Sequence, residues 1–273
     1  MSNKRSKTVI TILTIMLAGA CATPLVPPTS PDALSQGRPG YVIGYLKTAE
    51  LPDSVALVPP PPISGSPAQA LDEETYRATR SLRDSPRWKL AAKHANLEFP
   101  SAADTFSCVL DMPISEAVTP HLNILLRRIR ADASRANDKA KDFYKRPRPY
   151  MVHGESNCTP NEKLRPDAYP SGHASIGWAW SLVLAEIIPE RGDAILARGF
   201  AFGQSRIICG SHWKSDVDAG RLVGAATVSR LHVNPEFAAQ LALARKEIES
   251  ARRAGTKSQL DCAAESQALA SGP

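Results

Sequence analysis

The sequence lacks several patterns that would assign it to a familiar class at once. After residue 20 no apolar run is long enough to cross a membrane, so we expect no membrane span in the mature chain. There is no C-x-x-C pair of the kind found in zinc and redox sites, and no H-E-x-x-H segment or two-metal carboxylate set. Alternating strands joined by hairpin turns, and internal repeats, are also missing. These absences argue against a membrane-embedded protein, a metalloenzyme and a β-protein.

The bulk composition is that of an ordinary globular protein. The chain has 273 residues, of which 43% are hydrophobic and 22% charged, which is enough for a substantial core in one domain or a small pair. The formal net charge is +6, from 33 basic and 27 acidic residues. Three of the bases (Lys4, Arg5 and Lys7) lie at the N-terminus, so the rest of the chain is only weakly basic.

Residues 1–20 are expected to be a secretory signal peptide. The three bases precede an unbroken run of apolar or small residues, VITILTIMLAGA (9–20). Two forms of processing fit. The end of this run, A-G-A, matches a signal-peptidase site, whereas LAGAC (17–21) resembles a lipoprotein box that would put a lipid anchor on Cys21, with its leucine one position too far from the cysteine. In either case we expect an exported bacterial protein, periplasmic or secreted.

Export makes the remaining cysteines candidates for disulfides. An even number of cysteines in an oxidising compartment indicates structural cross-links. The sequence alone leaves all three pairings open for these four residues: Cys108, Cys158, Cys209 and Cys262.

The chain divides into four segments by composition. After the signal peptide, residues 21–66 are rich in proline, with PPPP at 59–62, and predict an extended arm that is either disordered or laid across the folded body. Residues 67–253 form the helical domain, and 254–273 read as a flexible polar tail that Cys262 could pin. The fold class is therefore all-α. Helical periodicity and capping signals predict helices over 70–83, 86–96, 101–110, 120–144, 173–189, 193–202, 215–231 and 235–253.

The first cluster of residues that could bind or react with a ligand lies at the end of the long basic helix. Residues 127–148 hold nine bases against three acids, which fits a solvated helix face or a nucleic-acid surface. The ending RPRP (146–149) fits neither, because its prolines hold Arg148 in extended backbone, away from the helix face. A rigidly presented guanidinium near the helical Lys141 suits an oxyanion.

The second cluster, PSGH (170–173), opens an apolar helix. Ser171 is a good N-cap, and Gly172 lets the backbone come close to a ligand. Free amides at a helix N-terminus form a natural phosphate site. His173 would lie in the first turn beside that anion, although a lone histidine at such a place is more often a packed core residue.

The third cluster runs from Ser205 to Asp216. Gly210 looks like a helix terminator, and a serine at 211 or 215 like the next N-cap. His212 and Asp216 are four residues apart, so on one helical face the carboxylate could fix the imidazole tautomer and leave the other nitrogen reactive. Arg206 adds a fixed positive charge. The alternative for this pair is a commonplace surface contact.

Together the clusters fit phosphoryl transfer without a metal. Cations hold the phosphoryl oxygens, one histidine attacks, and the other protonates the leaving oxygen. The other histidines lack ligand spacing, and we expect them to be structural or exposed: His94, His121, His153 and His232.

The three motifs resemble the signature of the type-2 phosphatidic acid phosphatase superfamily: K-x6-RP (141–149), PSGH (170–173) and SR-x5-H-x3-D (205–216). The chain further resembles the bacterial class A non-specific acid phosphatases over roughly residues 45–250, in stretches such as GQSRIICGSHWKSDVDAG (203–220). The resemblance implies a compact helical bundle. It also implies a periplasmic enzyme, often a homo-oligomer, that hydrolyses many small phosphomonoesters without a cofactor. Some members transfer the phosphoryl group to an alcohol.

The resemblance also implies a role for each motif residue. His212 resembles the nucleophile that becomes phosphohistidine, Asp216 its orienting partner, and His173 the general acid. The phosphate cradle would consist of Lys141, Arg148, Ser171, Gly172 and Arg206. Because one histidine must be neutral and the other protonated, we expect a bell-shaped pH profile with an acidic optimum.

Three rival functions share parts of this pattern. A vanadium-dependent haloperoxidase uses the same motifs, but the chains typical of those enzymes are much longer and have a further active-site histidine. A lipid phosphatase would be expected to have membrane spans. A non-catalytic phosphate-binding module would not need both histidines and the aspartate. The sequence does not identify the physiological substrate, the balance of hydrolysis and transfer, or the oligomer size.

Overall fold

The computed structural model describes residues 26–160 and 164–272, so the expected signal peptide and Cys21 lie outside the described residues. The described chain is helical and carries one two-stranded sheet, which confirms the all-α class. Besides three 3-10 turns, the elements are β1 (Gln36–Arg38), β2 (Tyr41–Val42), α1 (Ser54–Leu57), α2 (Pro67–Arg80), α3 (Pro86–Lys93), α4 (Asp104–Leu110), α5 (Pro120–Arg135), α6 (Asp138–Tyr144), α7 (Pro149–His153), α8 (Gly172–Ile187), α9 (Gly192–Ile208), α10 (Lys214–Leu231), α11 (Pro235–Arg253) and α12 (Cys262–Ala270).

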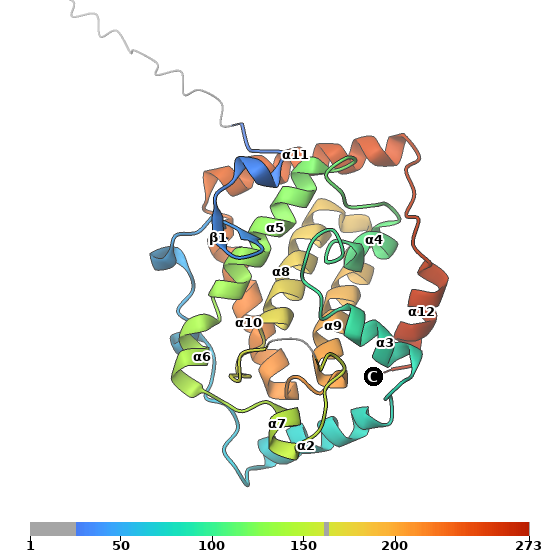
Figure 1. The fold of residues 1–273 in the computed structure, drawn as a ribbon. Helices are drawn as coiled ribbons and strands as arrows, with labels where there is room; N and C mark the ends of the chain where they lie inside the picture. The colour runs from blue at the N-terminus through green and yellow to red at the C-terminus, as the bar shows by residue number, and fades with distance from the viewer. Residues whose placement is uncertain (1–25, 161–163, 273) are drawn as a thin grey trace, which may run out of the picture.

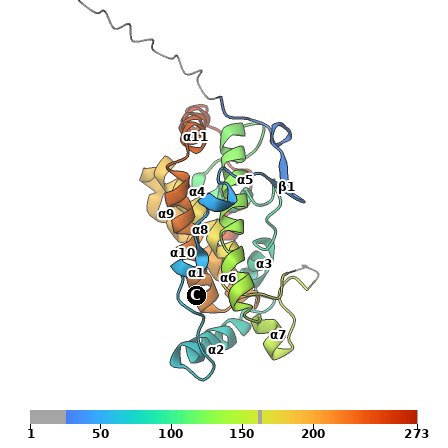
Figure 2. The same cartoon turned by 90° about the vertical axis from the view of Figure 1, so that its left-hand side faces the viewer.

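Helix α8 forms the centre of the bundle. It packs against α9, α10 and α5, and α11 packs against α5 at one end of the bundle (Figures 1 and 2). The apolar run that follows PSGH is therefore buried on nearly all sides, and the indole of Trp180 is fully buried and donates to the Leu126 carbonyl at 2.9 Å. The PSGH segment lies at the end of this central helix, so the bundle holds it rigidly from several directions.

Two glycines let α10 approach α8 closely. A Cβ on Gly220 would lie 2.4 Å from the Ser171 carbonyl oxygen, and a Cβ on Gly224 would lie 2.4 Å from that of Ser175. Any side chain at these positions would force the helices apart. The close approach brings the start of α10 to the start of α8, where the Ser171 amide donates to the Asp216 carbonyl at 2.8 Å.

The proline-rich arm lies across the folded body. It forms the β1–β2 hairpin and α1, and a polar face of α5 holds its backbone. The buried carboxylate of Asp132 accepts the amide of Tyr45 at 2.7 Å, and Arg128 donates to the Gly44 carbonyl at 2.9 Å. Of the two arrangements expected for the arm, the structure has the second over residues 26–66.

Several boundaries differ from the predicted ones, and the helix predicted over 193–202 continues to Ile208 in α9. The helix predicted over 120–144 is two helices, α5 and α6, because the buried Asn137 amide donates to the Ala133 carbonyl at 2.6 Å and the chain turns there. The short α7, which begins at the last proline of RPRP, was not predicted. The polar tail contains α12, whose N-cap Asp261 accepts the amide of Ala264 at 2.9 Å.

The four cysteines form two disulfides, Cys108–Cys262 and Cys158–Cys209. The first joins α12 to α4, and the second joins the 154–171 segment to the end of α9. Along 26–160 and 164–272, no helix has both the length and the apolar content needed to cross a bilayer.

Candidate active site

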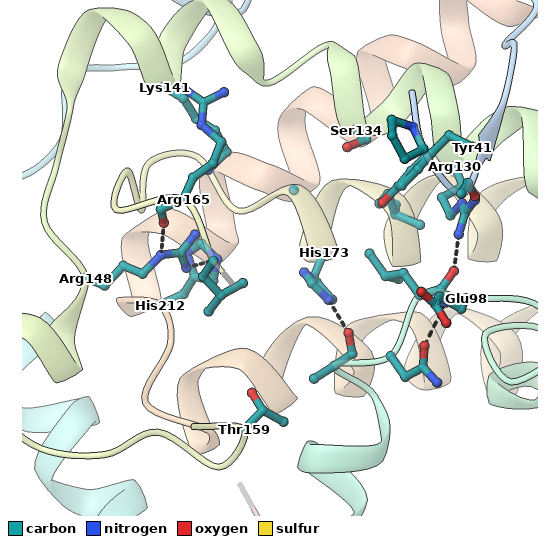
Figure 3. Close-up of a pocket in the computed structure, with 18 of the residues that line it drawn as sticks. Tyr41, Glu98, Arg130, Ser134, Lys141, Arg148, Thr159, Arg165, His173 and His212 are labelled. Carbon is teal, nitrogen blue, oxygen red and sulfur yellow. Dashed lines mark hydrogen bonds between the residues drawn. The ribbon is translucent and has the colours of Figure 1, made fainter. Parts of the chain in front are cut away.

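A cavity of about 640 Å³ opens where the three sequence motifs meet. Lys141, Arg148 and His212 gather on one side of it and His173 lies between them and the far wall (Figure 3). That far wall comes from the arm, α5 and the α3–α4 connection, with Tyr41, Glu98, Arg130 and Ser134 among its residues. Segments far apart in the sequence thus enclose one space.

His212 is nearly fully buried and each ring nitrogen has a defined neighbour. Its Nε2 lies 2.9 Å from Nη1 of Arg148, and its Nδ1 lies 3.3 Å from Oδ2 of Asp216. Because arginine can only donate, Nε2 is the acceptor, so Nδ1 carries the proton and donates to the carboxylate. The unprotonated Nε2 lone pair therefore points toward Arg148 and the cavity.

The contact between His212 and Asp216 does not arise as expected. His212 precedes α10, whose N-cap is Trp213 and not a serine. Asp216 sits in the first turn, where Oδ2 also accepts the Trp213 amide at 2.8 Å. A capping carboxylate, rather than a side chain on a shared helical face, therefore orients the imidazole.

Arg146 completes this orienting network and was not assigned a role from the sequence. Its guanidinium donates to Oδ1 of Asp216 at 2.6 Å and to Oδ2 of Asp72, on α2, at 2.8 Å. All three side chains are buried. The Asp72 carboxylate also accepts the Ser215 amide at 2.8 Å, which ties α2 to the start of α10. Nothing in the sequence links Asp72 to this site.

The cationic side of the cavity is built by α6 and the RPRP segment. Arg148 has an extended backbone (φ −75°, ψ 150°), as the flanking prolines predict. Its guanidinium donates to the carbonyls of Arg165 (2.6 Å), Ser211 (2.9 Å) and Asp167 (3.3 Å). Lys141 donates from α6 to the Asp167 carbonyl at 3.0 Å. Both cations are fixed by backbone oxygens, so they are preorganised for an anion.

The start of α8 faces the same cavity. Ser171 is the N-cap, and its hydroxyl accepts the Ala174 amide at 3.3 Å. Gly172 lines the cavity, and a Cβ there would meet no atom within 4 Å. His173 lines it too, donating from Nε2 to the Ala95 carbonyl at 2.9 Å, and its ring stacks on Phe202. The helix start thus offers both an amide terminus and an imidazole.

Arg206 lies behind the cavity wall. It is fully buried in the last turn of α9, and its carbonyl accepts the amides of Ser211 (3.0 Å) and His212 (3.2 Å). It is not among the residues that line the cavity, and neither is Ser171. Gly210, with φ of 77°, ends this helix as predicted and turns the chain toward His212. The backbone of Arg206 therefore supports the backbone of His212 from behind the cavity wall.

Burial and charge set the protonation states at the site. Burial, reinforced by Arg148 and Lys141, holds the pKa of His212 well below its ordinary value, so the ring is neutral. Burial also lowers the pKa of Lys141 to about 7, with a further contribution from Arg148. The pKa of Asp216 is raised by burial, and the Arg146 guanidinium opposes this rise.

Besides Arg146, which does not line the cavity, several residues that do line it were missed from the sequence. Thr159 and Arg165 come from the segment that the Cys158–Cys209 disulfide anchors, and Tyr41 comes from the arm. No motif marks them. Within the part of the chain that is described, no three His, Cys, Asp or Glu side chains are grouped so as to hold a metal ion.

The helical bundle and the meeting of the three motifs at one cavity agree with a comparison against known families. The family described as the PAP2 superfamily matches residues 123–237. The chain belongs to this superfamily. It is 43% identical to a non-specific acid phosphatase of Providencia stuartii over 77% of this chain and 86% of that protein. It is 40% identical to an acid phosphatase of Zymomonas mobilis subsp. mobilis, over 79% and 83% respectively. A non-specific acid phosphatase of Salmonella typhimurium is 42% identical over 70% and 78%.

Proposed function

We propose that this acid phosphatase hydrolyses a broad range of small phosphomonoesters through a phosphohistidine intermediate on His212, without a metal ion. The observation that carries the proposal is the arrangement of the His212 ring. Asp216 holds its Nδ1–H while Nε2 faces Arg148 at the cavity. A neutral imidazole fixed in this tautomer, next to fixed cations, is suited to attack phosphorus.

In the first step the Nε2 lone pair of His212 attacks the phosphorus, and the bond from phosphorus to the ester oxygen breaks. Lys141, Arg148 and the α8 amides hold the phosphoryl oxygens, with Arg206 adding positive charge from behind. The departing oxygen takes a proton from the protonated His173 ring. Because Nε2 of His173 faces the Ala95 carbonyl, we assign that proton to Nδ1.

In the second step a water attacks the phosphorus of the phosphohistidine. His173, now neutral, takes a proton from this water as the bond from phosphorus to nitrogen breaks. Inorganic phosphate leaves, and His212 returns to its starting state. An alcohol in place of the water would give phosphoryl transfer, and a cavity of about 640 Å³ has room for such an acceptor.

The cavity supports a broad substrate range because its fixed contacts gather at the phosphoryl end. Its far wall comes from several different segments and gives the leaving group ample space. We therefore expect nucleotides, sugar phosphates and aryl phosphates to be substrates, and we expect no role for nucleic acid.

The first test is hydrolysis of p-nitrophenyl phosphate by the mature protein in excess EDTA. We expect turnover, with a bell-shaped pH profile and an acidic optimum. Absence of turnover, with activity restored by a metal ion, would overturn the metal-independent mechanism. Rapid mixing with labelled substrate followed by alkaline denaturation should trap a base-stable, acid-labile phosphoryl group on wild-type protein and none on His212→Ala.

We further propose export to the periplasm or beyond, and assembly into a homo-oligomer. The two disulfides support export, because such cross-links persist in oxidising compartments. Cell fractionation would locate the protein, and mass spectrometry of the mature N-terminus would distinguish cleavage after Ala20 from lipidation of Cys21. Sedimentation would give the oligomer size.

A further inference from the structure

The C-terminal helix α12 brings a carboxylate into the protein interior. The helix packs against α3 (Figure 1). The Cys108–Cys262 disulfide fixes its first residue to α4. The side chain of Glu265 is only 12% exposed. It accepts two hydrogen bonds from Arg198 on α9, at 3.1 and 3.2 Å. A bidentate pair of this kind fixes the orientation of the guanidinium as well as its charge.

The oriented guanidinium of Arg198 also contacts a buried histidine, His94. Its Nη2 lies 2.8 Å from Nε2 of His94, which is 2% exposed and follows α3. Because arginine donates, Nε2 accepts, and the ring proton is on Nδ1, 2.7 Å from the hydroxyl of Ser205. Ser205 also accepts from Arg87 at 3.0 Å and donates to the Ala201 carbonyl at 3.0 Å. The hydroxyl has no freedom to turn, so the His94 ring is locked.

This locked ring is directly connected to the active site. The next residue, Ala95, provides the carbonyl that accepts Nε2–H of His173 at 2.9 Å. The rings of His94 and His173 also both contact Phe202, with centroid distances of 5.2 and 6.3 Å. A shift of His94 would therefore move both the hydrogen-bond acceptor and the aromatic support of His173.

We propose that Glu265 is a positioning residue for His173, acting through Arg198 and His94, and that the Cys108–Cys262 disulfide holds it in place. The proposal rests on the proposed role of His173 as general acid. Without the carboxylate, Arg198 would remain buried with one strong acceptor fewer and would draw away from His94 to find another. The active site would keep its nucleophile and phosphate cradle but lose the alignment of its acid.

The dependence of activity on the leaving group tests this proposal. An alkyl phosphate needs a proton on its leaving oxygen, whereas a dinitrophenyl phosphate has a leaving group that departs unprotonated. The value of kcat/KM reports the step that forms phosphohistidine. For Glu265→Gln we expect kcat/KM to fall about 10-fold on glycerol 2-phosphate and less than about 2-fold on 2,4-dinitrophenyl phosphate. The 10-fold loss is a part of the roughly 10²–10⁴-fold acceleration that a general acid contributes.

Three further variants make the test decisive. The double variant Cys108→Ser with Cys262→Ser should show the same selective loss, which covers the case in which Glu265→Gln does not fold. Glu249→Gln removes a carboxylate from an exposed position on α11 and should leave both substrates unaffected. His173→Asn sets the full effect of losing the acid.

The outcomes separate the positioning role of Glu265 from the role of His173 as the acid. Equal losses on both substrates for Glu265→Gln would overturn the positioning role and indicate a structural one, as would no loss on either. A selective loss in His173→Asn would then show that the proposed acid still stands. If His173→Asn itself loses activity equally on both substrates, the assignment of the acid fails and the positioning proposal fails with it.

Discussion

Two equally buried histidines in this molecule have similar hydrogen-bond partners, but only one of them lines the cavity. His212 and His94 are each 2% exposed, and in each Nε2 accepts from an arginine while Nδ1–H is held by an oxygen. His212 lines the cavity and is held by a carboxylate, whereas His94 does not line it and is held by a hydroxyl. If His212 is the nucleophile as proposed, a fixed tautomer alone does not make a histidine catalytic. A place on the cavity wall and a charged partner are what distinguish the His212 ring from the His94 ring.

Replacing each histidine should give the largest contrast. His212→Ala removes the proposed nucleophile, and we expect kcat to fall by at least about 10³-fold, as when a member of a catalytic unit is lost. His94→Gln leaves the nucleophile in place, so we expect less than about a 30-fold loss on an alkyl phosphate. Steady-state kinetics measure both. Sulfate affinity, measured by calorimetry, should be retained in His212→Ala. Similar losses of kcat in the two variants would contradict the difference expected between the two histidines.

Replacing the Nδ1 partners should give a smaller contrast in the same direction. Asp216→Asn can place an N–H against His212 and favour the wrong tautomer, so we expect kcat to fall about 10²–10⁴-fold. Ser205→Ala removes a neutral acceptor from His94, together with the hydrogen bonds of the hydroxyl to Arg87 and the Ala201 carbonyl. It should lower the free energy of unfolding by about 1–3 kcal/mol while changing kcat on an aryl phosphate less than about 3-fold. Kinetics and urea unfolding test this, and a larger effect on kcat in Ser205→Ala would contradict it.

Anion binding in the cavity should depend on pH through Lys141. Burial lowers the pKa of Lys141 to about 7, so the lysine is charged below that pH and neutral above it. Binding of sulfate, whose charge is constant from pH 5 to 9, should therefore weaken as pH rises through about 7, by up to about 10-fold per unit. Inhibition constants against p-nitrophenyl phosphate measure this. Lys141→Arg should flatten the dependence, and a flat wild-type profile would remove Lys141 from the cradle.

The sequence predicted the residues around His212 and the start of α8 far better than the residues around His94. Spacing and capping signals marked His212, Asp216, Ser171 and Gly172, because local backbone geometry determines how these residues present themselves. The superfamily resemblance then assigned their roles. The helix content also followed from periodicity, and the membership of the PAP2 superfamily is confirmed. Even so, the reason given for the His212–Asp216 contact was wrong, since His212 precedes the helix.

Residues that act through tertiary contacts had no such signal. Asp72 lies 74 positions from Arg146, and Glu265 lies 67 positions from Arg198 in a tail that looked merely polar. A carboxylate in such a segment has no periodic neighbours that would indicate burial. The same reason applies to Tyr41, which only the folding of the arm across α5 brings to the cavity. Sequence patterns find residues whose neighbours are local, and these residues have distant ones.

The smallest effect is expected at Gly172, which faces open space, in contrast to Gly220, which lies in the packed interior. A methyl group at Gly172 would enter the cavity without meeting any atom within 4 Å, whereas one at Gly220 would lie 2.4 Å from the Ser171 carbonyl. Gly172→Ala should therefore keep or slightly raise stability, by about 0.4–1 kcal/mol, and raise KM a few-fold because the methyl group occupies space next to the bound phosphoryl group. Gly220→Ala should lower both stability and kcat. Thermal unfolding and kinetics on p-nitrophenyl phosphate measure both, and unchanged kinetics in Gly172→Ala would show that phosphate does not approach the start of α8.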